Sequence, residues 1–364
     1  MADYFGFRAV GQGLFYTGSL LDGNYNFVYD CGTDNSQSYI RREVARFNTV
    51  CHKKELEFVV ISHLHHDHYS GLQELMNNFT VKQIFLPYLG SLNLTELVLA
   101  NSTFGRRRIA ATNFEEDRAL FRFMWGLYFE DSDIMRAERI FLGRENNDSE
   151  PDSEFIHTFR YFNFKKEGMP YWEFHFLNKT YNSKIMKNFE DKVDNLIKNY
   201  GVRSIRELID DGQIGLIKRM YEEVFGRGNY LNLTSTVLVH FPTELNKCFL
   251  LRRRPYWRLC GSECFHTNRA ITLLTGDAEM DSNEIAQLNS ILTGGSGILQ
   301  VPHHGSYPNW TSLGNIRNYF NAMVIPVGRN GHGLPSPRTV HEIQSRNVSL
   351  HYADQNHGCH YTII

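Results

Sequence analysis

Apolar residues in the first 91 positions are spaced as in strands that alternate with helices. Short apolar runs predict an opening antiparallel set of three strands, over 5–10, 13–18 and 25–30. Ile40, Val44 and Phe47 recur at helical spacing, which predicts an amphipathic helix over 38–49. Further runs predict a strand, a helix and another strand, over 57–62, 71–78 and 83–87. This part of the chain therefore reads as one β-rich half of a domain.

The last third of the chain shows the same alternation. Strands are predicted over 235–241, 247–252, 270–275, 298–301 and 322–327. Helices are predicted over 282–291, 311–320 and 337–345. The first three of these strands are predicted to belong to a second sheet. Two β-rich halves with helices on the outside indicate an α/β fold of four layers in the order αββα.

The stretch from 92 to 230 does not fit that core. It contains two helical-looking segments, over 115–129 and 184–224, and an acidic polar loop between them. Aromatic residues are dense here, at Phe155, Phe159, Tyr161, Phe162, Phe164, Tyr171, Trp172, Phe174 and Phe176. They form either the core of an insertion that roofs the site or a stacking surface for bases. We predict a first core half at 1–91, an insertion at 92–230 and a second core half at 231–364.

Composition and charge agree with a soluble enzyme. The 364 residues are 42 % hydrophobic and 21 % charged, which suits one large domain with an insertion or two domains. The net charge of −2 gives no overall attraction to nucleic acid or membrane, so a polyanion requires a local basic surface or bound metals. The start of the chain lacks a secretory pattern, and no apolar stretch is long enough to span a bilayer. We expect a cytoplasmic protein that does not bind membranes.

Six cysteines are scattered along the chain, at 31, 51, 248, 260, 264 and 359. In a protein expected to be cytosolic, this spread indicates reduced thiols rather than a disulfide framework. Cys260 and Cys264, with His266 just after them, are spaced as in a small zinc knuckle, but a fourth ligand is not evident. A hairpin that carries two ordinary thiols is the interpretation we prefer.

The densest chemistry follows a buried apolar run and consists of His63-Leu64-His65-His66-Asp67-His68. Imidazole nitrogens and carboxylate oxygens are the ligands expected for zinc and neighbouring divalent metals. Alternate side chains of an extended segment point the same way, so His63 and His65 can hold one ion together. Asp67 and His68 lie beyond a bend and can face a second ion, whereas His66 lies outside this set. The loop therefore predicts a metal site.

Three further landmarks follow in order, at Asp30, Asp277 and His303-His304-Gly305-Ser306. Together with His63-x-His65-x-Asp67-His68, they resemble the signature of the metallo-β-lactamase superfamily. The resemblance implies a four-layer αββα sandwich in which Asp30 supports the site and Asp277 bridges two metals. It also implies that the late histidine pair supplies a metal ligand. The landmarks span residues 26–306.

The closer resemblance is to the hydrolase domain of bacterial competence (DNA-uptake) proteins. It rests on Thr275-Gly276-Asp277, Val301-Pro302-His303-His304-Gly305-Ser306 and Gly331-His332-Gly333-Leu334-Pro335-Ser336-Pro337. One departure is that Gly333 and Leu334 separate His332 from Pro335, where the branch more often has proline at once. A second is that no membrane-spanning portion accompanies the domain. The resemblance therefore implies nucleic-acid degradation rather than DNA uptake itself.

Two other branches of the superfamily fit this chain less well. Glyoxalase-type and lactamase-type members carry an extra metal histidine after the middle strands. Here that region offers Asn232, Thr234 and Ser235, and no histidine before His240. Nucleases that process RNA 3′ ends or repair cross-links insert a large cassette before the last histidine, and 278–302 is too short for one.

The resemblance implies two divalent metal ions, zinc or manganese, that activate a shared hydroxide near neutral pH. The implied ligands are His63 and His65 for one ion, Asp67, His68 and His304 for the other, and Asp277 as the bridge. The first ion then needs water, substrate or another side chain to complete its coordination. The predicted catalytic residues are Asp67, His303 and His332. Adjacent side chains of an extended segment diverge, so we expect His304 to be the ligand and His303 to meet the substrate or leaving oxygen; the reverse stays open.

These features predict a metal-dependent phosphodiesterase or nuclease that acts on nucleic acid, with DNA favoured. Its role would be nucleic-acid turnover or bacterial defence against foreign DNA. Arginines at 106–108 and 252–254, the latter near Tyr256 and Trp257, suit a single strand, or they belong to a solvated hairpin. The alternatives are a hydrolase of a small ester, lactone or phosphoester, or a non-catalytic metal-binding module. A partner protein or self-association is left open.

Overall fold

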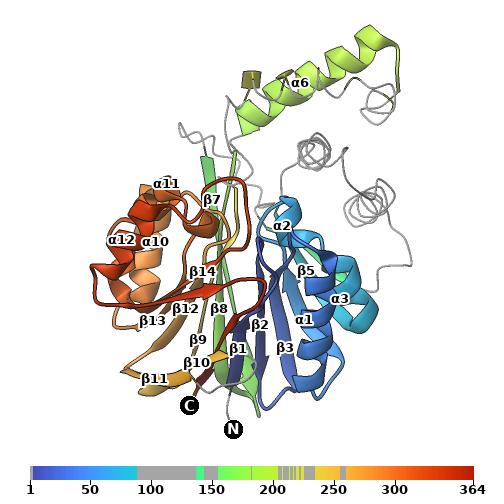
Figure 1. Cartoon of the computed structure of the whole chain (residues 1–364). Helices are drawn as coiled ribbons and strands as arrows, with labels where there is room; N and C mark the ends of the chain where they lie inside the picture. The colour runs from blue at the N-terminus through green and yellow to red at the C-terminus, as the bar shows by residue number, and fades with distance from the viewer. Residues whose placement is uncertain are drawn as a thin grey trace.

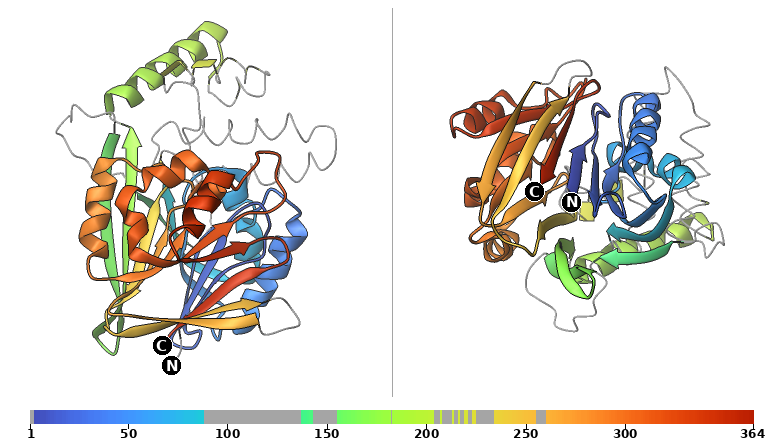
Figure 2. Two further views of the ribbon diagram at one scale, coloured as in Figure 1. Left: turned by 60° about the vertical axis from the view of Figure 1, so that its left-hand side comes forward. Right: turned by 90° about the horizontal axis from the view of Figure 1, so that it is seen from below.

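The computed structural model describes residues 3–87, 137–142, 155–181, 183–203, 234–254 and 260–364, and single positions between 204 and 230. Two large sheets pack face to face, and helices cover the outer face of each (Figure 1). The view from below in Figure 2 shows the same order of layers, helix, sheet, sheet, helix. The predicted α/β fold with αββα layers is therefore confirmed.

The first sheet has nine strands in the order β11-β10-β16-β1-β2-β3-β4-β5-β6. They are β1 (Asp3–Phe7), β2 (Phe15–Leu20), β3 (Tyr25–Cys31), β4 (Glu55–Val60), β5 (Thr80–Pro87), β6 (Glu138–Leu142), β10 (Lys247–Arg254), β11 (Cys260–Thr267) and β16 (Gly358–Ile363). Strands β3 to β6 pair in parallel, whereas the other neighbours pair antiparallel. The antiparallel opening set predicted from the sequence is confirmed.

The second sheet has seven strands in the order β15-β14-β13-β12-β9-β8-β7. They are β7 (Phe155–Lys166), β8 (Met169–Tyr181), β9 (Val237–Pro242), β12 (Ala270–Leu274), β13 (Ser296–Gln300), β14 (Phe320–Pro326) and β15 (Ser349–Ala353). Strands β12 to β15 pair in parallel, and β7, β8, β9 and β12 pair antiparallel in turn. Parallel strands thus lie in both sheets, and their carboxyl ends carry the loops considered below.

The helices are α1 (Gln37–Val50), α2 (His66–Tyr69), α3 (Leu72–Asn78), α6 (Ser183–Tyr200), α10 (Ser282–Leu292), α11 (Tyr307–Ser312) and α12 (Pro337–Gln344). Helix α1 begins where the Ser36 side chain accepts a hydrogen bond from Ser38 N, and it buries Ile40, Val44 and Phe47 as its spacing predicts. Helix α10 begins with a capping box formed by Asp281. In the part of the chain that the structure describes, no helix is long and apolar enough to cross a membrane.

Three apolar layers hold the sandwich together. Two of them lie between a sheet and its outer helices: one contains Ile40 and Val44 of α1 against the first sheet, and the other contains Leu288 of α10 against the second. The third lies between the sheets and is built largely of aromatic side chains, such as Phe27 and Phe174. Burying large apolar side chains on both faces of each sheet is the main contribution to stability in such a fold.

Two expectations about single elements are wrong. The strand predicted over 247–252 was expected in the second sheet, but β10 pairs with β16 and β11 in the first sheet. The helix predicted over 311–320 is divided into α11 and a 3₁₀ helix, η2 (Gly314–Tyr319). Gly314, the first residue of η2, has a φ of 53°, a left-handed conformation that glycine adopts without steric cost.

The stretch 92–230 contributes strands to both sheets, although it was expected not to fit the core. β6 extends the first sheet, and the hairpin of β7 and β8 extends the second. Trp172, Phe174 and Phe176 lie in the layer between the sheets, whereas Phe159 and Tyr161 are exposed. The helix predicted over 115–129 lies outside the described residues. The division of the chain into 1–91, 92–230 and 231–364 stays a prediction.

Candidate metal centre

The predicted ligands lie where strands of both sheets end. The loop 63–68 follows β4 and continues into α2, which lies at the upper end of the sandwich in Figure 1. Asp30 lies at the end of β3, and Asp277 follows β12. The 3₁₀ turn η1 (His303–Gly305) follows β13. Because β3 and β4, like β12 and β13, run in parallel, the segments that follow them emerge at the same edge of each sheet.

Asp277 is buried within this cluster, and its two carboxylate oxygens face different histidines. Oδ1 lies 3.2 Å from His68 Nε2 and 3.9 Å from His304 Nε2. Oδ2 lies 3.7 Å from His63 Nε2 and 3.7 Å from His303 Nε2. Asp277 therefore has the geometry of a carboxylate shared between two groups of ligands.

Two compact groups of buried donor atoms result, His63 with His68 and Asp277, and Asp67 with His68 and His304. In the second group, His304 Nε2 lies 2.9 Å from Asp67 Oδ2. Beside the first group, His65 Nδ1 lies 2.9 Å from His63 Nε2. The six residues predicted as metal ligands are thus brought together in one cluster.

Asp30 and Ser62 orient two of these imidazoles. Asp30 Oδ2 accepts hydrogen bonds from His68 Nδ1 at 2.7 Å and from Ser62 Oγ at 2.6 Å. Because Ser62 donates its one hydroxyl proton to Asp30, its oxygen accepts from His63 Nδ1 at 3.0 Å. Both imidazoles therefore carry a proton on Nδ1 and direct Nε2 toward Asp277, as metal-binding histidines direct it toward their ion.

The turn that carries Asp277 is held by Gln300. The Gln300 Oε1 atom accepts from Thr275 N at 2.7 Å and from Gly276 N at 2.8 Å, while Nε2 donates to Gly276 O at 2.9 Å. Gly276 has a φ of 55°, and a Cβ at this position would lie 2.8 Å from Ser62 Oγ. Glycine is therefore required by the backbone conformation and by the closeness of Ser62.

The donor set fits divalent ions. His68 Nε2 and Asp277 Oδ1 are buried and form no hydrogen bond, although they lie only 3.2 Å apart. A neutral imidazole nitrogen and a carboxylate oxygen are both acceptors, so such a buried pair is stable only when a proton or a metal cation lies between them. Donors that share a tetrahedral zinc at about 2.0–2.2 Å lie about 3.3–3.6 Å from one another, close to what is seen here. Imidazole and carboxylate ligands also suit manganese.

The charges of the site favour cation binding. Burial lowers the pKa of the His63 imidazole well below its usual value and that of His65 to about 4, so both are neutral near pH 7. Burial also acts to lower the pKa of His68, but the surrounding carboxylates, led by Asp277, outweigh it and raise that pKa well above its usual value. Carboxylates that draw a proton onto a buried imidazole also attract a divalent ion.

The predicted catalytic residues have different positions. Asp67 lies among the ligands, and His303 lies beside Asp277. His332 is exposed on the loop after β14, and its imidazole forms no hydrogen bond with the described residues. His66, which we did not expect to bind metal, lies 3.0 Å from Asp34. The arginines at 106–108, the side chains at 252–254, and Tyr256 and Trp257 lie outside the described residues.

Three supporting residues were not predicted from the sequence. They are Ser62, Gln300 and Asn309. Ser62 directly precedes the histidine loop, and Gln300 is a polar residue at the end of an apolar strand, so each had a local signal. Asn309 had none, because its role depends on where α11 places it relative to Asp277.

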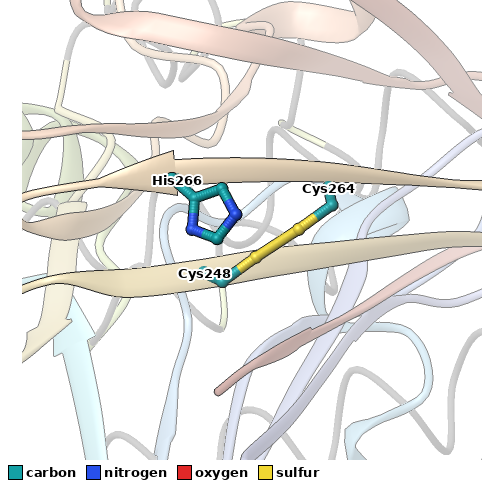
Figure 3. A group of neighbouring side chains, drawn as sticks. All are labelled: Cys248, Cys264 and His266. Carbon is teal, nitrogen blue, oxygen red and sulfur yellow. A yellow bond between two sulfur atoms is a disulfide. The ribbon is translucent and has the colours of Figure 1, made fainter.

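Another group of potential ligands lies on the neighbouring strands β10 and β11 (Figure 3). In Figure 1 these strands lie at the lower end of the sandwich, whereas α2 lies at the upper end. Cys248 and Cys264 form a disulfide, with His266 beside them. The expectation of reduced thiols is wrong for this pair. The pairing of β10 with β11 places Cys248 opposite His266 and therefore diagonal to Cys264, which local spacing does not reveal. Of the zinc knuckle considered as the less favoured alternative, the Cys260 side chain lies outside the described residues. Cys31, Cys51 and Cys359 are buried thiols.

Comparison with known proteins gives one family match. The family model described as the metallo-beta-lactamase superfamily matches residues 15–92, a stretch that contains β2 to β5 and the loop 63–68. No curated protein matches the chain. Members of this superfamily are mostly hydrolases that bind divalent metals. The match covers the first part of the chain only; with the sandwich of two sheets and the paired donor groups, it supports a relation to the metallo-beta-lactamase superfamily and suggests a metal-dependent hydrolase.

Proposed function

We propose that the protein is a metal-dependent phosphodiesterase that hydrolyses nucleic acid, with DNA as the favoured substrate. The observation that carries the proposal is the position of Asp277, whose two oxygens face separate groups of imidazoles. Such an arrangement supports two ions side by side. A pair of ions suits attack on a phosphodiester, because together they can stabilise the attacking and the leaving oxygen. The resemblance of the late motifs to competence-type hydrolases supports nucleic acid as the substrate class.

The residues of the site are proposed to have different roles in binding the metal ions. When bound, two divalent ions supply a nucleophile near neutral pH and offset the charge of the phosphoryl oxygens. His63 and His65 would hold the first ion, Asp67, His68 and His304 the second, and Asp277 both. Asp30 keeps His68 in the tautomer that presents Nε2, and Ser62 does the same for His63.

His332 is proposed to contact a phosphate or to protonate the leaving oxygen. Its loop is joined to the site, because Ser336 N donates to Gly305 O at 3.0 Å, directly after the two histidines of η1. The same loop is braced by Asn330, whose side-chain oxygen accepts from His332 N at 3.0 Å and from Leu334 N at 3.2 Å. An exposed imidazole on a braced loop beside the metal ligands is suited to meeting a substrate.

The test is cleavage of end-labelled single- and double-stranded DNA and RNA in Mn²⁺ and in Zn²⁺. We expect cleavage by the parent protein, loss of cleavage in Asp277→Ala, and unchanged cleavage in His52→Ala, which removes an exposed histidine between α1 and β4 that belongs to none of the donor groups. His332→Ala should retain both ions but cleave about 10²-fold more slowly, the usual size of a lost acid–base contact.

Other outcomes redirect the assignment. If the parent binds two ions but leaves every nucleic acid intact, the nuclease proposal fails. Cleavage of p-nitrophenyl esters, lactones or small phosphodiesters would then favour the small-substrate alternative. Absence of all these activities would favour a metal-binding module without catalysis.

A further inference from the structure

The ligands assigned so far give the first ion an incomplete set of imidazoles. His63 and His65 supply two, and the middle strands supply none. The next histidine there, His240, is buried between the sheets and bonded to Tyr16 and Trp172. It therefore belongs to the core, and another residue must complete the first site.

His303 lies on the side of Asp277 that faces the first site. Its Nε2 is 3.7 Å from Asp277 Oδ2, the same oxygen that lies 3.7 Å from His63 Nε2. His304 lies on the other side, 2.9 Å from Asp67 and 3.9 Å from Asp277 Oδ1. The imidazoles of the two adjacent histidines thus lie near different oxygens of the Asp277 carboxylate.

The backbone of η1 makes this possible. His303 has a φ of 47° and His304 a φ of 50°, so both are in the left-handed conformation rather than extended. Side chains of consecutive residues need not diverge to opposite faces in such a tight turn. Left-handed backbone is uncommon in residues other than glycine, and it occurs often at functional sites.

Asn309 determines which nitrogen of His303 carries the proton. The Asn309 Nδ2 atom donates to the backbone oxygens of Asp277 and Ala278, at 2.9 and 3.3 Å, and these oxygens can only accept. The amide oxygen of Asn309 therefore faces His303 Nδ1, 3.1 Å away, and Nδ1 donates to it. The lone pair of His303 is then on Nε2, the atom nearest Asp277 Oδ2. This is the orientation expected of a metal-binding imidazole with a supporting hydrogen bond.

We propose that His303 Nε2 is the third imidazole ligand of the ion held by His63 and His65, a role that His240 of the middle strands does not fill. The inference rests on the metal-dependent hydrolase proposed above, but it concerns metal coordination and not the substrate. It revises the expectation that only one histidine of the pair binds metal. Asn309 is then a positioning residue for this ligand.

One other side chain competes for the same role. Ser235 Oγ is buried and forms no hydrogen bond with the described residues. The next residue, Thr236, donates its backbone N–H to Ser62 O at 2.8 Å, so this segment lies against the start of the histidine loop. A neutral hydroxyl is a weaker ligand than imidazole for zinc and its neighbours. Comparing the two residues by substitution separates the alternatives.

The experiment counts bound ions in the absence of any substrate. Apo protein is titrated with Co²⁺, followed by its visible absorption and by calorimetry, for the parent and for His303→Gly, Ser235→Ala and His52→Ala. Glycine is chosen at 303 because it accepts the positive φ. We expect two equivalents in the parent and in the last two variants. His303→Gly should bind one ion normally and the other at least ten-fold more weakly, and added imidazole should restore the second equivalent.

Three results would overturn this inference. One is two ions of parental affinity in His303→Gly, and another is loss of an ion in Ser235→Ala but not in His303→Gly. The third is a parent that binds a single ion. Circular dichroism and the unfolding midpoint of His303→Gly distinguish a lost ligand from a lost fold, and rescue by imidazole requires an intact site. Failure of nucleic-acid cleavage with normal Co²⁺ binding would count against the proposed function alone. Asn309→Leu should weaken the same ion about 10- to 100-fold, the usual cost of a lost supporting hydrogen bond.

Discussion

The side chain of Gln300 is buried. It forms hydrogen bonds with both the backbone N–H and the backbone carbonyl of Gly276, the residue before Asp277. Gln300→Leu keeps the volume but leaves buried backbone donors and acceptors of the turn without partners, at about 1–3 kcal/mol for each group. We expect a loss of several kcal/mol in the free energy of unfolding and weaker metal binding. Urea denaturation and Co²⁺ titration measure the two effects. Gln344→Leu, an exposed site in α12, should change stability by less than about 0.5 kcal/mol.

Gly276 and Gly294 provide a matched pair for testing the space around the ligand turn. Both have positive φ, at 55° and 76°, but a Cβ at 276 would meet Ser62 at 2.8 Å whereas none lies within 4 Å at 294. Gly294→Ala should cost only the conformational strain of about 1–2 kcal/mol. We expect Gly276→Ala to cost more and to weaken metal binding, because Ser62 orients His63. Equal destabilisation of the two variants, with metal affinity intact in both, would contradict this account.

At the residue scale, site residues that lie together in a short motif can be predicted from the sequence. Side-chain positions that depend on the backbone conformation cannot. The histidine loop and Asp277 were predictable because residue type and order alone mark them. The choice between His303 and His304 rested on an extended backbone, and the structure has a left-handed turn instead. Asn309 was not predictable, since an asparagine in a helix carries no signal until its partners are known.

At the element scale, a buried ion pair joins β8 to α10. Lys179 Nζ lies 2.8 Å from Glu284 Oε2, and both side chains are 2 % exposed. Removing one member leaves the other charge buried without compensation, which typically costs about 3–5 kcal/mol. We therefore expect Lys179→Met to lower the free energy of unfolding by that amount, and Lys179→Met with Glu284→Leu to recover part of it.

An exposed pair provides the control for this measurement. Lys192 and Glu223 lie 3.1 Å apart but are 38 % and 65 % exposed. Lys192→Met should therefore change stability by no more than about 1 kcal/mol. Similar losses in Lys179→Met and Lys192→Met, measured by denaturant unfolding, would show that the buried pair does not anchor the hairpin to α10.

The bounds of most elements were predictable because apolar periodicity is local, as in α1 and α10. The partners of the strands were not predictable in the same way. β10 follows β9 in the chain, so adjacency suggested one sheet, yet β10 pairs with β16 in the other. The β7–β8 hairpin was read as part of an insertion because aromatic density does not reveal which surface it covers. Long-range pairing decides both cases.

At the scale of the whole molecule, His240 links the two sheets through a chain of buried hydrogen bonds. Trp172 Nε1 donates to His240 Nδ1 at 3.2 Å, so Nε2 donates to Tyr16 Oη at 2.8 Å. The network continues through Tyr361 to Thr272 of the second sheet. Every member is polar and buried, so the network favours one register of the sheets only while His240 stays neutral.

This network predicts a pH dependence of stability. Burial lowers the pKa of His240 to about 3, against about 6.5 in the unfolded chain, so the unfolded state takes up the proton first as pH falls. The contribution of neutral His240 to the free energy of unfolding is complete above about pH 6.5. It declines toward pH 3 by about 1.4 kcal/mol per pH unit. Between pH 6.5 and 5, the parent should lose about 2 kcal/mol more than His240→Gln, in which the amide retains both hydrogen bonds without titrating. Parallel stability curves from urea unfolding would refute this.

The four-layer class was predictable for the whole molecule because periodicity and the landmark motifs agree. The composition of the first sheet was not, since it combines strands from both ends of the described chain. Asp3 of β1 stands opposite Ile363 of β16, and β16 also carries β10 on its other side.

That pairing has a consequence for synthesis on the ribosome. About 350 residues separate β1 from β16. At a synthesis rate of about 5–20 residues per second, the edge of β1 therefore stays unpaired for roughly 20–70 s before β16 is made. An unpaired strand edge is a template for pairing with other chains. Nascent chains are therefore expected to depend on chaperones that cover this edge, and crowded polysomes should favour aggregation at β1 over folding.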